Sequence, residues 1–415
     1  MRIAVYSHYF LPEIGAPSAR IGDFAAQWLR GGHTVDVATC FPNHPSGTLY
    51  PDYESAHYLH EKIKGIDVHR SWTYITPNRG FVKKTLGHAS FWLSAGAVSS
   101  RRMPAPDCAV GTSPTFFAAM AARAKARRHR VPFIMEVRDL WPAIFVDLGV
   151  VRNRKIIRLL EIWEMNLYRT ATKIVTLTDS FRDNLIARGI PAKKVATITN
   201  GADTEFWKPA DAEAKQLRTE LGLDSAFVVL YIGAHGISQG LAAQIRAAAH
   251  MGDLPNVQFI FVGEGADKEK LEAEGRQRGL TNVRFLPPVG KERVRDFYSM
   301  ADLCLVPLRN IPLFDTFIPS KIFEIMAVGR PILASLRGEA ANILARSKAA
   351  KIVPPEDSVA IAAAIRELSR SPQDLQSMAE NGPRFVEQHY SRRGLAHRYL
   401  EVIRDARAEM GLAAE

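Results

Sequence analysis

The sequence has few cysteines and no long apolar run, and both absences exclude classes of protein. Its 415 residues contain three cysteines, Cys40, Cys108 and Cys304, far apart within apolar, strand-like segments. We therefore expect reduced core thiols and no metal-binding spacing. The longest weakly polar stretch, residues 86–98, is interrupted by polar side chains and is shorter than the ~20 residues that cross a bilayer. This pattern predicts no transmembrane span.

Targeting and nucleic-acid signals are also missing. Residues 1–7 lead directly into an apolar strand pattern without the flanks of a signal peptide, which predicts a cytoplasmic protein. No recognition-helix, aromatic-platform or zinc-finger pattern occurs, which argues against nucleic acid as a partner.

Acidic charge is scarce in the first half of the chain. Residues 1–208 contain 28 Lys and Arg against 17 Asp and Glu, whereas residues 209–415 contain 26 of each, so the whole net charge of +11 belongs to the first half. The excess is concentrated at Lys83-Lys84, Arg101-Arg102, residues 123–130 and residues 152–158, around the apolar segment 91–93. Such a pattern predicts binding to an anionic membrane surface, where each basic side chain adds about 1 kcal/mol of attraction. Ordinary solvated helix faces remain the alternative.

Short apolar, β-branched runs alternate with helical segments from end to end. The expected strands lie at residues 2–8, 34–41, 107–114, 132–139, 173–179, 227–234, 257–265, 283–289, 301–308 and 330–335. Alternation over this length predicts an α/β protein of two doubly wound, Rossmann-like domains facing each other across a cleft. We expect domains at residues 1–205 and 206–388, with residues 389–415 forming a helix that returns to the first domain.

The most informative segment is residues 301–335, a strand, a loop and a helix start. Pro319 suits the first turn of a helix, and Lys321 and Glu324, three residues apart, share a face beside Ser320 and the helix N-terminus. Free amides and a positive dipole end attract phosphate there, Lys321 adds charge, and Glu324 can accept ribose hydroxyls. The alternative is a surface Lys/Glu pair worth about 0.2–0.5 kcal/mol.

Glycine turns and one charged pair follow other predicted strands. Gly15, Gly233 and Gly263 permit close backbone approach to an anion, although no G-x-G-x-x-G occurs and plain loop glycines are an alternative. Arg138 and Asp139 stand at the carboxyl end of a strand, the usual place of reacting groups in this architecture, with an internal ion pair as the alternative.

In combination these features resemble a retaining sugar-nucleotide glycosyltransferase of glycosyltransferase family 4, with the GT-B arrangement of two Rossmann-like domains. The resemblance covers essentially the whole chain. It rests on the Gly15 loop, the turns at 233–240 and 263–265, the P-S-K-x-x-E start ending in Glu324, and the R-D-L-W-P sequence at 138–142. The last two are typical of bacterial enzymes of surface-polysaccharide assembly.

The resemblance implies roles for particular residues. Glu324 would hold the ribose, Ser320 and Lys321 the diphosphate, and Val289 would lie near the base. Gly15 would let its loop close over the diphosphate, and Arg20 would face the donor or the acceptor. The remaining implied donor-binding residues are Gly233, Gln239, Gly263, Asp315 and Thr316; the implied catalytic residues are Arg138, Asp139 and Lys321.

The sequence departs from the family pattern in three respects. Thr316, beside Asp315, stands where the first acid of the E-x7-E motif is expected. Ala234 and Gln239 replace an Arg and a Lys, which leaves more of the diphosphate charge to Lys321. Arg138-Asp139 replaces a His-Asp pair. An altered sugar preference, N-acetylated or deoxy, would explain the first change, and so would loss of activity.

The sequence therefore predicts an enzyme that transfers a sugar from a UDP-sugar to a lipid-linked saccharide, with retention and without a metal or other cofactor. It would be a peripheral protein at the inner face of the cytoplasmic membrane. A sugar-nucleotide epimerase of similar fold is one alternative. A catalytically silent membrane or nucleic-acid scaffold, favoured by Thr316, Ala234 and Gln239, is the other.

Overall fold

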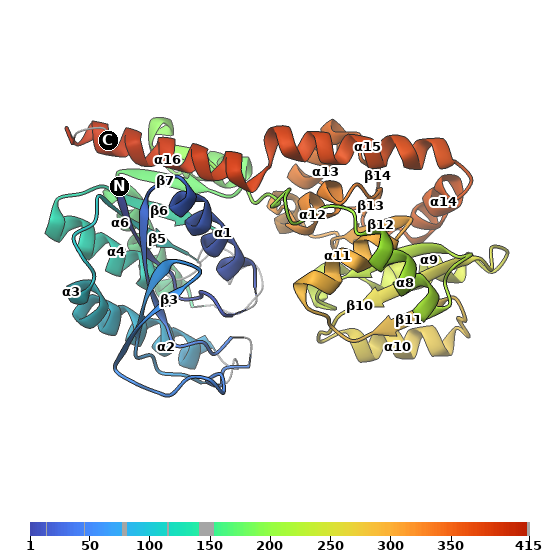
Figure 1. Ribbon diagram of the computed structural model, residues 1–415, viewed down its shortest axis with the longest axis horizontal. Coiled ribbons are helices and arrows are strands. Elements are labelled where there is room, and N and C mark those ends of the chain that lie inside the picture. The colour runs from blue at the N-terminus through green and yellow to red at the C-terminus, as the bar shows by residue number, and fades with distance from the viewer. Residues whose placement is uncertain (14, 45, 77–80, 114–115, 141–152, 413–415) are drawn as a thin grey trace. The chain divides into compact units, whose positions relative to one another are not determined.

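The chain folds into two compact units, each built on its own sheet (Figure 1). The computed structural model describes residues 1–13, 15–44, 46–76, 81–113, 116–140 and 153–412. Unit 1 comprises Met1–Thr199 together with Arg392–Glu415, and unit 2 comprises Asn200–Ser391. Trp141 and Pro142 of the R-D-L-W-P sequence lie outside the described residues.

Unit 1 contains an eight-stranded sheet with the order β3-β4-β2-β1-β5-β6-β7-β8. The strands are β1 (Arg2–Tyr6), β2 (Thr34–Cys40), β3 (Tyr58–Ile63), β4 (Ile66–Ser71), β5 (Cys108–Thr112), β6 (Phe133–Val137), β7 (Lys173–Thr176) and β8 (Val195–Thr197). Neighbours run parallel, with Tyr6 opposite Ala38 and Gly111, except that β3 pairs antiparallel with β4 at one edge.

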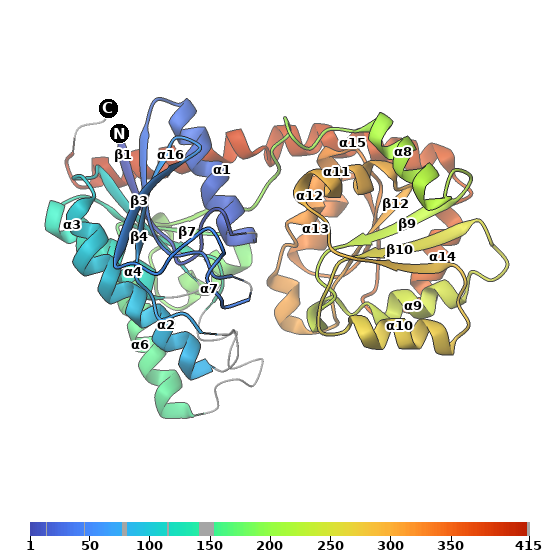
Figure 2. The same ribbon diagram turned by 60° about the horizontal axis from the view of Figure 1, so that its bottom comes forward.

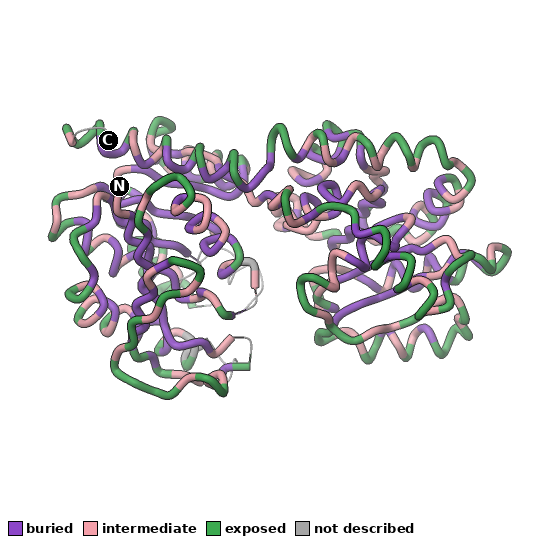
Figure 3. Tube along the Cα trace, in the orientation of Figure 1, coloured by how far each residue is buried: buried purple, intermediate pink, exposed green. Residues whose placement is uncertain are grey.

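Helices cover both faces of this sheet. They are α1 (Ala16–Arg30), α2 (Phe81–Ser94), the π-helix η1 (Ala95–Ser99), α3 (Ser100–Arg102), α4 (Phe116–His129), α6 (Arg154–Thr170), α7 (Asp179–Ala187), the 3-10 helix η2 (Ala192–Lys194) and α16 (Arg392–Glu409). α1 and α16 pack on one face, and α2, α4 and α6 pack on the other (Figure 2). The central strands between them are buried, whereas the edge strand β3 is half-exposed (Figure 3).

The C-terminal helix α16 belongs to unit 1 because it covers the apolar stripe of α1. Phe24 and Trp28, one turn apart, are fully buried against Tyr399, and the Trp28 indole N–H donates to the Ala396 carbonyl at 3.1 Å. Arg392 at the start of α16 lies 3.4 Å from the Asp23 carboxylate. Each of these aromatic side chains contributes about 3–5 kcal/mol, measured as the cost of truncation to alanine.

Unit 2 contains a six-stranded, all-parallel sheet with the order β11-β10-β9-β12-β13-β14. Its strands are β9 (Phe227–Ile232), β10 (Val257–Val262), β11 (Val283–Leu286), β12 (Leu303–Pro307), β13 (Ile332–Ser335) and β14 (Ala350–Val353). The α-helices are α8 (Asp211–Leu221), α9 (Ala242–Ala249), α10 (Lys268–Gln277), α11 (Lys291–Met300), α12 (Lys321–Ala327), α13 (Glu339–Ser347), α14 (Ser358–Leu368) and α15 (Pro372–His389). Two short 3-10 turns, η3 (Ile237–Gln239) and η4 (Pro312–Thr316), precede functional candidates.

The prediction of two Rossmann-like α/β domains is confirmed, with two local corrections. The strands β3, β4, β8 and β14 were not predicted, and the antiparallel pairing of β3 with β4 departs from the expected parallel arrangement. α12 begins at Lys321 with Ser320 as its N-cap, so Pro319 precedes the helix instead of lying in its first turn. Within the described residues, no helix is both long enough and apolar enough to span a bilayer.

Candidate functional site

The carboxyl ends of β9, β10 and β11 are joined by backbone hydrogen bonds between their glycine turns. The Gly233 N–H donates to the Val262 carbonyl at 2.9 Å, and the Gly263 N–H donates to the Leu286 carbonyl at 3.1 Å. The next turn is fixed by the His235 N–H, which donates to the Glu264 carbonyl at 2.8 Å. Sheet order therefore brings the predicted turns 233–240 and 263–265 together.

Two of the predicted glycines have no room for a side chain. Gly233 has a φ of 142°, and a Cβ there would lie 2.7 Å from Nζ of Lys321. Gly263 has a φ of 143°, and its Cβ would lie 1.9 Å from the Gly233 carbonyl oxygen. Both positions favour glycine by conformation and by close approach.

Lys321 places a positive charge at the carboxyl ends of these strands. From the first residue of α12, its Nζ donates to the Ile232 carbonyl at 2.9 Å and lies 4.2 Å from the centre of the Tyr231 ring. In the part of the chain that the structure describes, Lys321 forms no ion pair with a carboxylate within 4.0 Å. The ammonium is thus held against the Gly233 turn with no counter-charge in contact.

Burial lowers the pKa of Lys321 to about 8, and the Glu324 carboxylate on the next turn opposes this shift. The Lys321 side chain is therefore mostly charged at pH 7, and a bound anion would stabilise this charged form. An ammonium has three N–H donors, so bonding to Ile232 leaves capacity for further acceptors.

Ser320 and Glu324 lie beside Lys321, as their spacing predicts. The Asn200 side-chain amide donates to Oγ of Ser320 at 2.8 Å, and the Tyr298 hydroxyl lies 3.5 Å from Oε2 of Glu324. Ser320, Lys321 and Glu324 therefore form one cluster at the start of α12.

The other predicted residues of unit 2 lie on loops after strands. Val289 follows β11 and packs against the core. Gln239 ends η3, and its buried Oε1 has no hydrogen-bond partner within the described residues. Asp315 and Thr316 end η4, where Thr316 Oγ1 donates to the Leu313 carbonyl at 2.8 Å and Asp315 lies 3.9 Å from Arg337.

Arg138 and Asp139 follow β6 in unit 1. The Arg138 N–H donates to Ser113 Oγ at 2.7 Å, whereas its buried Nε and Nη1 have no acceptor among the described residues. Burial lowers the pKa of Arg138 to about 10, against the attraction of Glu136. Burial also raises the pKa of Asp139 to about 6, against the attraction of Arg138.

Arg20 has a different environment from the one expected. Its side chain is 1% exposed and pairs with the fully buried Glu136 at 3.2 Å. Nη1 and Nη2 donate to the carbonyls of Thr199 and Ile198 at 2.7 Å and 2.8 Å. These contacts tie α1 to β6 and to the chain after β8. These contacts are all with the protein itself, whereas a contact with the sugar-nucleotide donor or the acceptor substrate was expected.

The environment of Gly15 also differs from the close backbone approach that was expected there. Gly15 is the N-cap of α1, but its φ of 162° is extended backbone that any residue adopts. A Cβ there would meet Pro17 at an ordinary 3.6 Å. The loop before it is held instead by Glu13, which accepts the amides of Asn43 and His44 at 2.8 Å and 2.9 Å.

Sequence reasoning missed two residues that support the cluster. Tyr231 lies under the Lys321 ammonium, and its hydroxyl donates to the Ala234 carbonyl at 2.6 Å. Asn200 binds Ser320 from 120 residues away. The only sequence signal for Tyr231 was its place two residues before Gly233. The described residues contain no group of three or more His, Cys, Asp or Glu that could hold a metal ion.

Two family descriptions together match most of the chain. Residues 15–201 match "Glycosyl transferase 4-like domain", and residues 214–385 match "Glycosyl transferases group 1". The two matches fall on the glycine and lysine positions described above. The chain combines a glycosyl transferase 4-like domain with a glycosyl transferases group 1 domain. It is therefore a glycosyltransferase with the GT-B fold.

Curated relatives of this glycosyltransferase include two with informative names. A putative colanic acid biosynthesis glycosyl transferase, WcaI of Escherichia coli K12, is 29% identical over 79% of this chain and 82% of its own. The alpha-D-kanosaminyltransferase of Streptomyces kanamyceticus is 29% identical over 55% of this chain and 59% of its own.

Solved structures agree in fold. Sucrose-phosphate synthase from Thermosynechococcus elongatus superposes with a TM-score of 0.75 at 18% identity, over 98% of this chain and 99% of that one. Anabaena HepE in complex with UDP-glucose gives a TM-score of 0.70 at 19% identity, over 97% of this chain and 99% of that one. At these identities the likeness concerns the fold alone.

Proposed function

We propose that the protein is a retaining glycosyltransferase that moves a sugar from a UDP-sugar to a hydroxyl of a lipid-linked saccharide in bacterial surface-polysaccharide biosynthesis. The observation that carries the proposal is the Lys321 ammonium, held without a carboxylate contact against the backbone of the Gly233 turn. The relative named for colanic acid biosynthesis supports the pathway class.

Charge stabilisation is the chemistry assigned to this site. As the bond between the sugar and the diphosphate breaks, negative charge grows on the departing β-phosphate. Lys321 and the amides at the start of α12 stabilise that charge more strongly than the charge of the bound donor, which lowers the barrier. One such preorganised donor is worth about 10²–10³-fold in turnover.

The remaining roles follow the positions of the residues. Glu324 accepts the ribose hydroxyls, Ser320 donates to the diphosphate, and Val289 lies by the base. Gly233 and Gly263 admit the diphosphate through their missing side chains. Residues lining the sugar are Gln239, Asp315 and Thr316, and an N-acetylated or deoxy sugar suits the missing acid at position 316.

From unit 1 we assign Arg138 and Asp139 to the reacting groups and Gly15 to the loop that covers the diphosphate. The unpartnered nitrogens of Arg138 suit an oxygen-rich ligand, and a carboxyl with a pKa of about 6 suits proton exchange near neutral pH. Arg20 is left out of this assignment because its ion pair with Glu136 and its bonds to the carbonyls of Thr199 and Ile198 lie within unit 1.

Two further properties belong to the proposal. Transfer is metal-independent, because the fixed ammonium supplies the positive charge that the diphosphate needs. The enzyme is a cytoplasmic, peripheral protein at the inner face of the membrane, where its basic N-terminal half attracts anionic lipid.

Calorimetric titration with UDP, followed by a mass-spectrometric screen of UDP-sugars and lipid-linked acceptors, tests the proposal. We expect micromolar UDP binding and a turnover that Lys321→Ala lowers about 10²–10³-fold without unfolding the protein. Lys270→Ala, an exposed lysine of α10 in the same unit, is the matched control and should change neither property. Absent UDP binding, or equal turnover of the Lys321 and Lys270 variants, would remove the assignment.

A further inference from the structure

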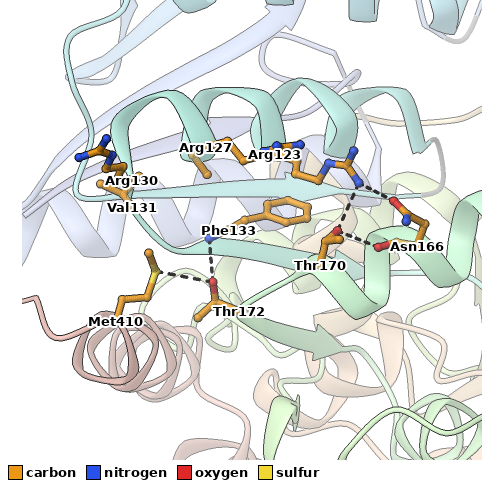
Figure 4. A pocket seen from close by; sticks show the side chains of 10 residues that line it. Arg123, Arg127, Arg130, Val131, Phe133, Asn166, Thr170, Thr172 and Met410 are labelled. Carbon is orange, nitrogen blue, oxygen red and sulfur yellow. Dashed lines mark hydrogen bonds between the residues drawn. The ribbon is translucent and has the colours of Figure 1, made fainter.

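Unit 1 contains a basic pocket at the amino-terminal edge of its sheet, away from Arg138 and Asp139. It has a volume of about 530 Å³ and lies between α4, α6 and the end of α16. Figure 4 shows Arg123, Arg127 and Arg130 on the α4 side, and Asn166, Thr170, Thr172 and Met410 on the opposite side. None of its ten lining residues is acidic.

The three arginines are not equivalent. Nη1 of Arg123 donates to Asn166 Oδ1 at 2.6 Å and to Thr170 Oγ1 at 3.3 Å, which fixes the rim of the pocket. Arg127 and Arg130 are exposed and form no ion pair within the described residues. Two cations without counter-ions, beside hydroxyl and amide groups, match an anion such as a phosphate.

An exposed apolar stripe on α6 leads directly to this pocket. Ile156, Leu159, Ile162 and Trp163 are 45% to 57% exposed. At 100° per residue, Leu159 and Trp163 share one side of the helix with Asn166 and Thr170, the α6 residues of the pocket. The neighbouring side, with Leu167 about 40° and Tyr168 about 140° from Trp163, is already buried in the core.

The exposed apolar stripe of unit 1 thus lies on α6, and the expected segment 91–93 is largely covered. Of the segment expected to meet a membrane, Phe91 is fully buried and Trp92 packs against the core, so only Leu93 is prominent at the surface. The stripe on α6 carries Lys155 and Arg158 along its flank, both exposed. Exposed apolar residues flanked by basic ones are typical of helices that lie in a membrane interface.

We propose that α4 and α6 form a docking site for an anionic phospholipid bilayer, in which the pocket binds a headgroup phosphate and the α6 stripe enters the acyl boundary. The site rests on the proposed function, because a lipid-linked acceptor places the enzyme at a membrane. The Arg127 and Arg130 side chains bind the phosphate oxygens. The positions from Ile156 to Thr170 span about 21 Å of helix, long enough to lie along the surface.

Flotation of the full-length protein with phosphatidylglycerol vesicles, against phosphatidylcholine vesicles, tests the site. Arg127→Ala/Arg130→Ala should weaken binding roughly thirtyfold, at about fivefold for each arginine. Leu159→Ser/Trp163→Ser should also lower binding at least about tenfold. The controls are Arg30→Ala/Lys193→Ala, which removes the same charge from exposed positions elsewhere in unit 1, and Val359→Ser, which removes an exposed apolar residue of unit 2. Both should lose less than about threefold.

Short-chain phosphatidylglycerol, inorganic phosphate and single-stranded RNA separate the possible occupants. Binding of the short-chain lipid that depends on Arg127 and Arg130, and exceeds binding of phosphate, supports the lipid site. Equal affinity for phosphate, equal loss in the charge control, or RNA binding with the same dependence would each overturn it. UDP titration of every variant keeps the two proposals apart. If the variants keep UDP binding and float like the wild type, only the docking site is refuted. If the wild type does not bind UDP, only the donor assignment is refuted.

Discussion

At the scale of single residues, Lys321 combines a charge with an environment that disfavours it. Its ammonium is bonded to a carbonyl and an aromatic face, and burial lowers its pKa to about 8. A cation held in this way is poorly compensated until an anion arrives. The free energy lost by burying the charge is therefore recovered when a diphosphate binds.

This linkage predicts a pH dependence of UDP affinity. The diphosphate raises the pKa of Lys321, so binding takes up a proton when the lysine starts out neutral. Affinity is then retained below about pH 8 and falls above it, approaching tenfold per pH unit. Calorimetry from about pH 7.5 to about pH 9.5 measures the slope. Lys321→Ala should give a flat profile, and a flat wild-type profile would contradict the role of the lysine.

Gly233 allows a second prediction at this scale. Gly233→Ala combines a φ of 142° with a Cβ placed 2.7 Å from the lysine nitrogen. We expect a loss of about 1–3 kcal/mol in unfolding free energy and a weaker affinity for UDP, because the ammonium must move. Thermal unfolding and calorimetry measure the two effects. Gly252→Ala, whose Cβ would meet nothing within 4 Å, should be neutral; equal behaviour of both variants would show that the contact is unimportant.

At the scale of elements, the Arg20–Glu136 pair joins α1 to β6 inside unit 1. Arg20→Met leaves the fully buried Glu136 without its ion pair, and we expect a destabilisation of about 3–5 kcal/mol. Scanning calorimetry should show a lower transition temperature. The control is Arg30→Met, on the same helix and exposed, which should unfold like the wild type. An unchanged transition temperature for Arg20→Met with a raised KM for the acceptor would restore the role first expected for Arg20.

Strands that are buried on both faces were predictable from their residues. β12 is a continuous apolar run between helical segments, and the predicted range of 301–308 contains the observed Leu303–Pro307. β3 was not predictable, because it is a half-exposed edge strand in which the polar residues His60, Glu61 and Lys62 are consecutive and break the strand period. β8 and β14, which are three and four residues long, were also missed.

The candidate site was predictable where its residues are close in sequence. The spacing of Lys321 and Glu324 on one helix start needs only helical geometry. The contacts of Tyr231 with Lys321 and of Asn200 with Ser320 were not predictable. They depend on which strand ends the sheet order brings together. Burial of Arg20 and of Phe91 was missed for a similar reason, since an arginine or an aromatic in an amphipathic helix gives no sign of which face is covered.

At the scale of the whole molecule, the charge excess of the first half predicts salt-dependent attachment to anionic vesicles. Raising the salt from about 0.1 M to about 1 M shortens the screening distance from about 10 Å to about 3 Å. We expect flotation with phosphatidylglycerol vesicles to fall at least about tenfold over this range. The residual binding at high salt should disappear in Leu159→Ser/Trp163→Ser. Binding that salt does not alter would show that the basic clusters play no part.

The return of α16 to unit 1 has a consequence for synthesis. Residues 200–391 leave the ribosome as one continuous segment, whereas unit 1 needs both ends of the chain. The second unit can therefore finish folding while Phe24 and Trp28 are not yet covered by α16. A nascent chain that stops before residue 392 exposes this apolar stripe, which makes it a substrate for chaperones or proteases until α16 has been translated.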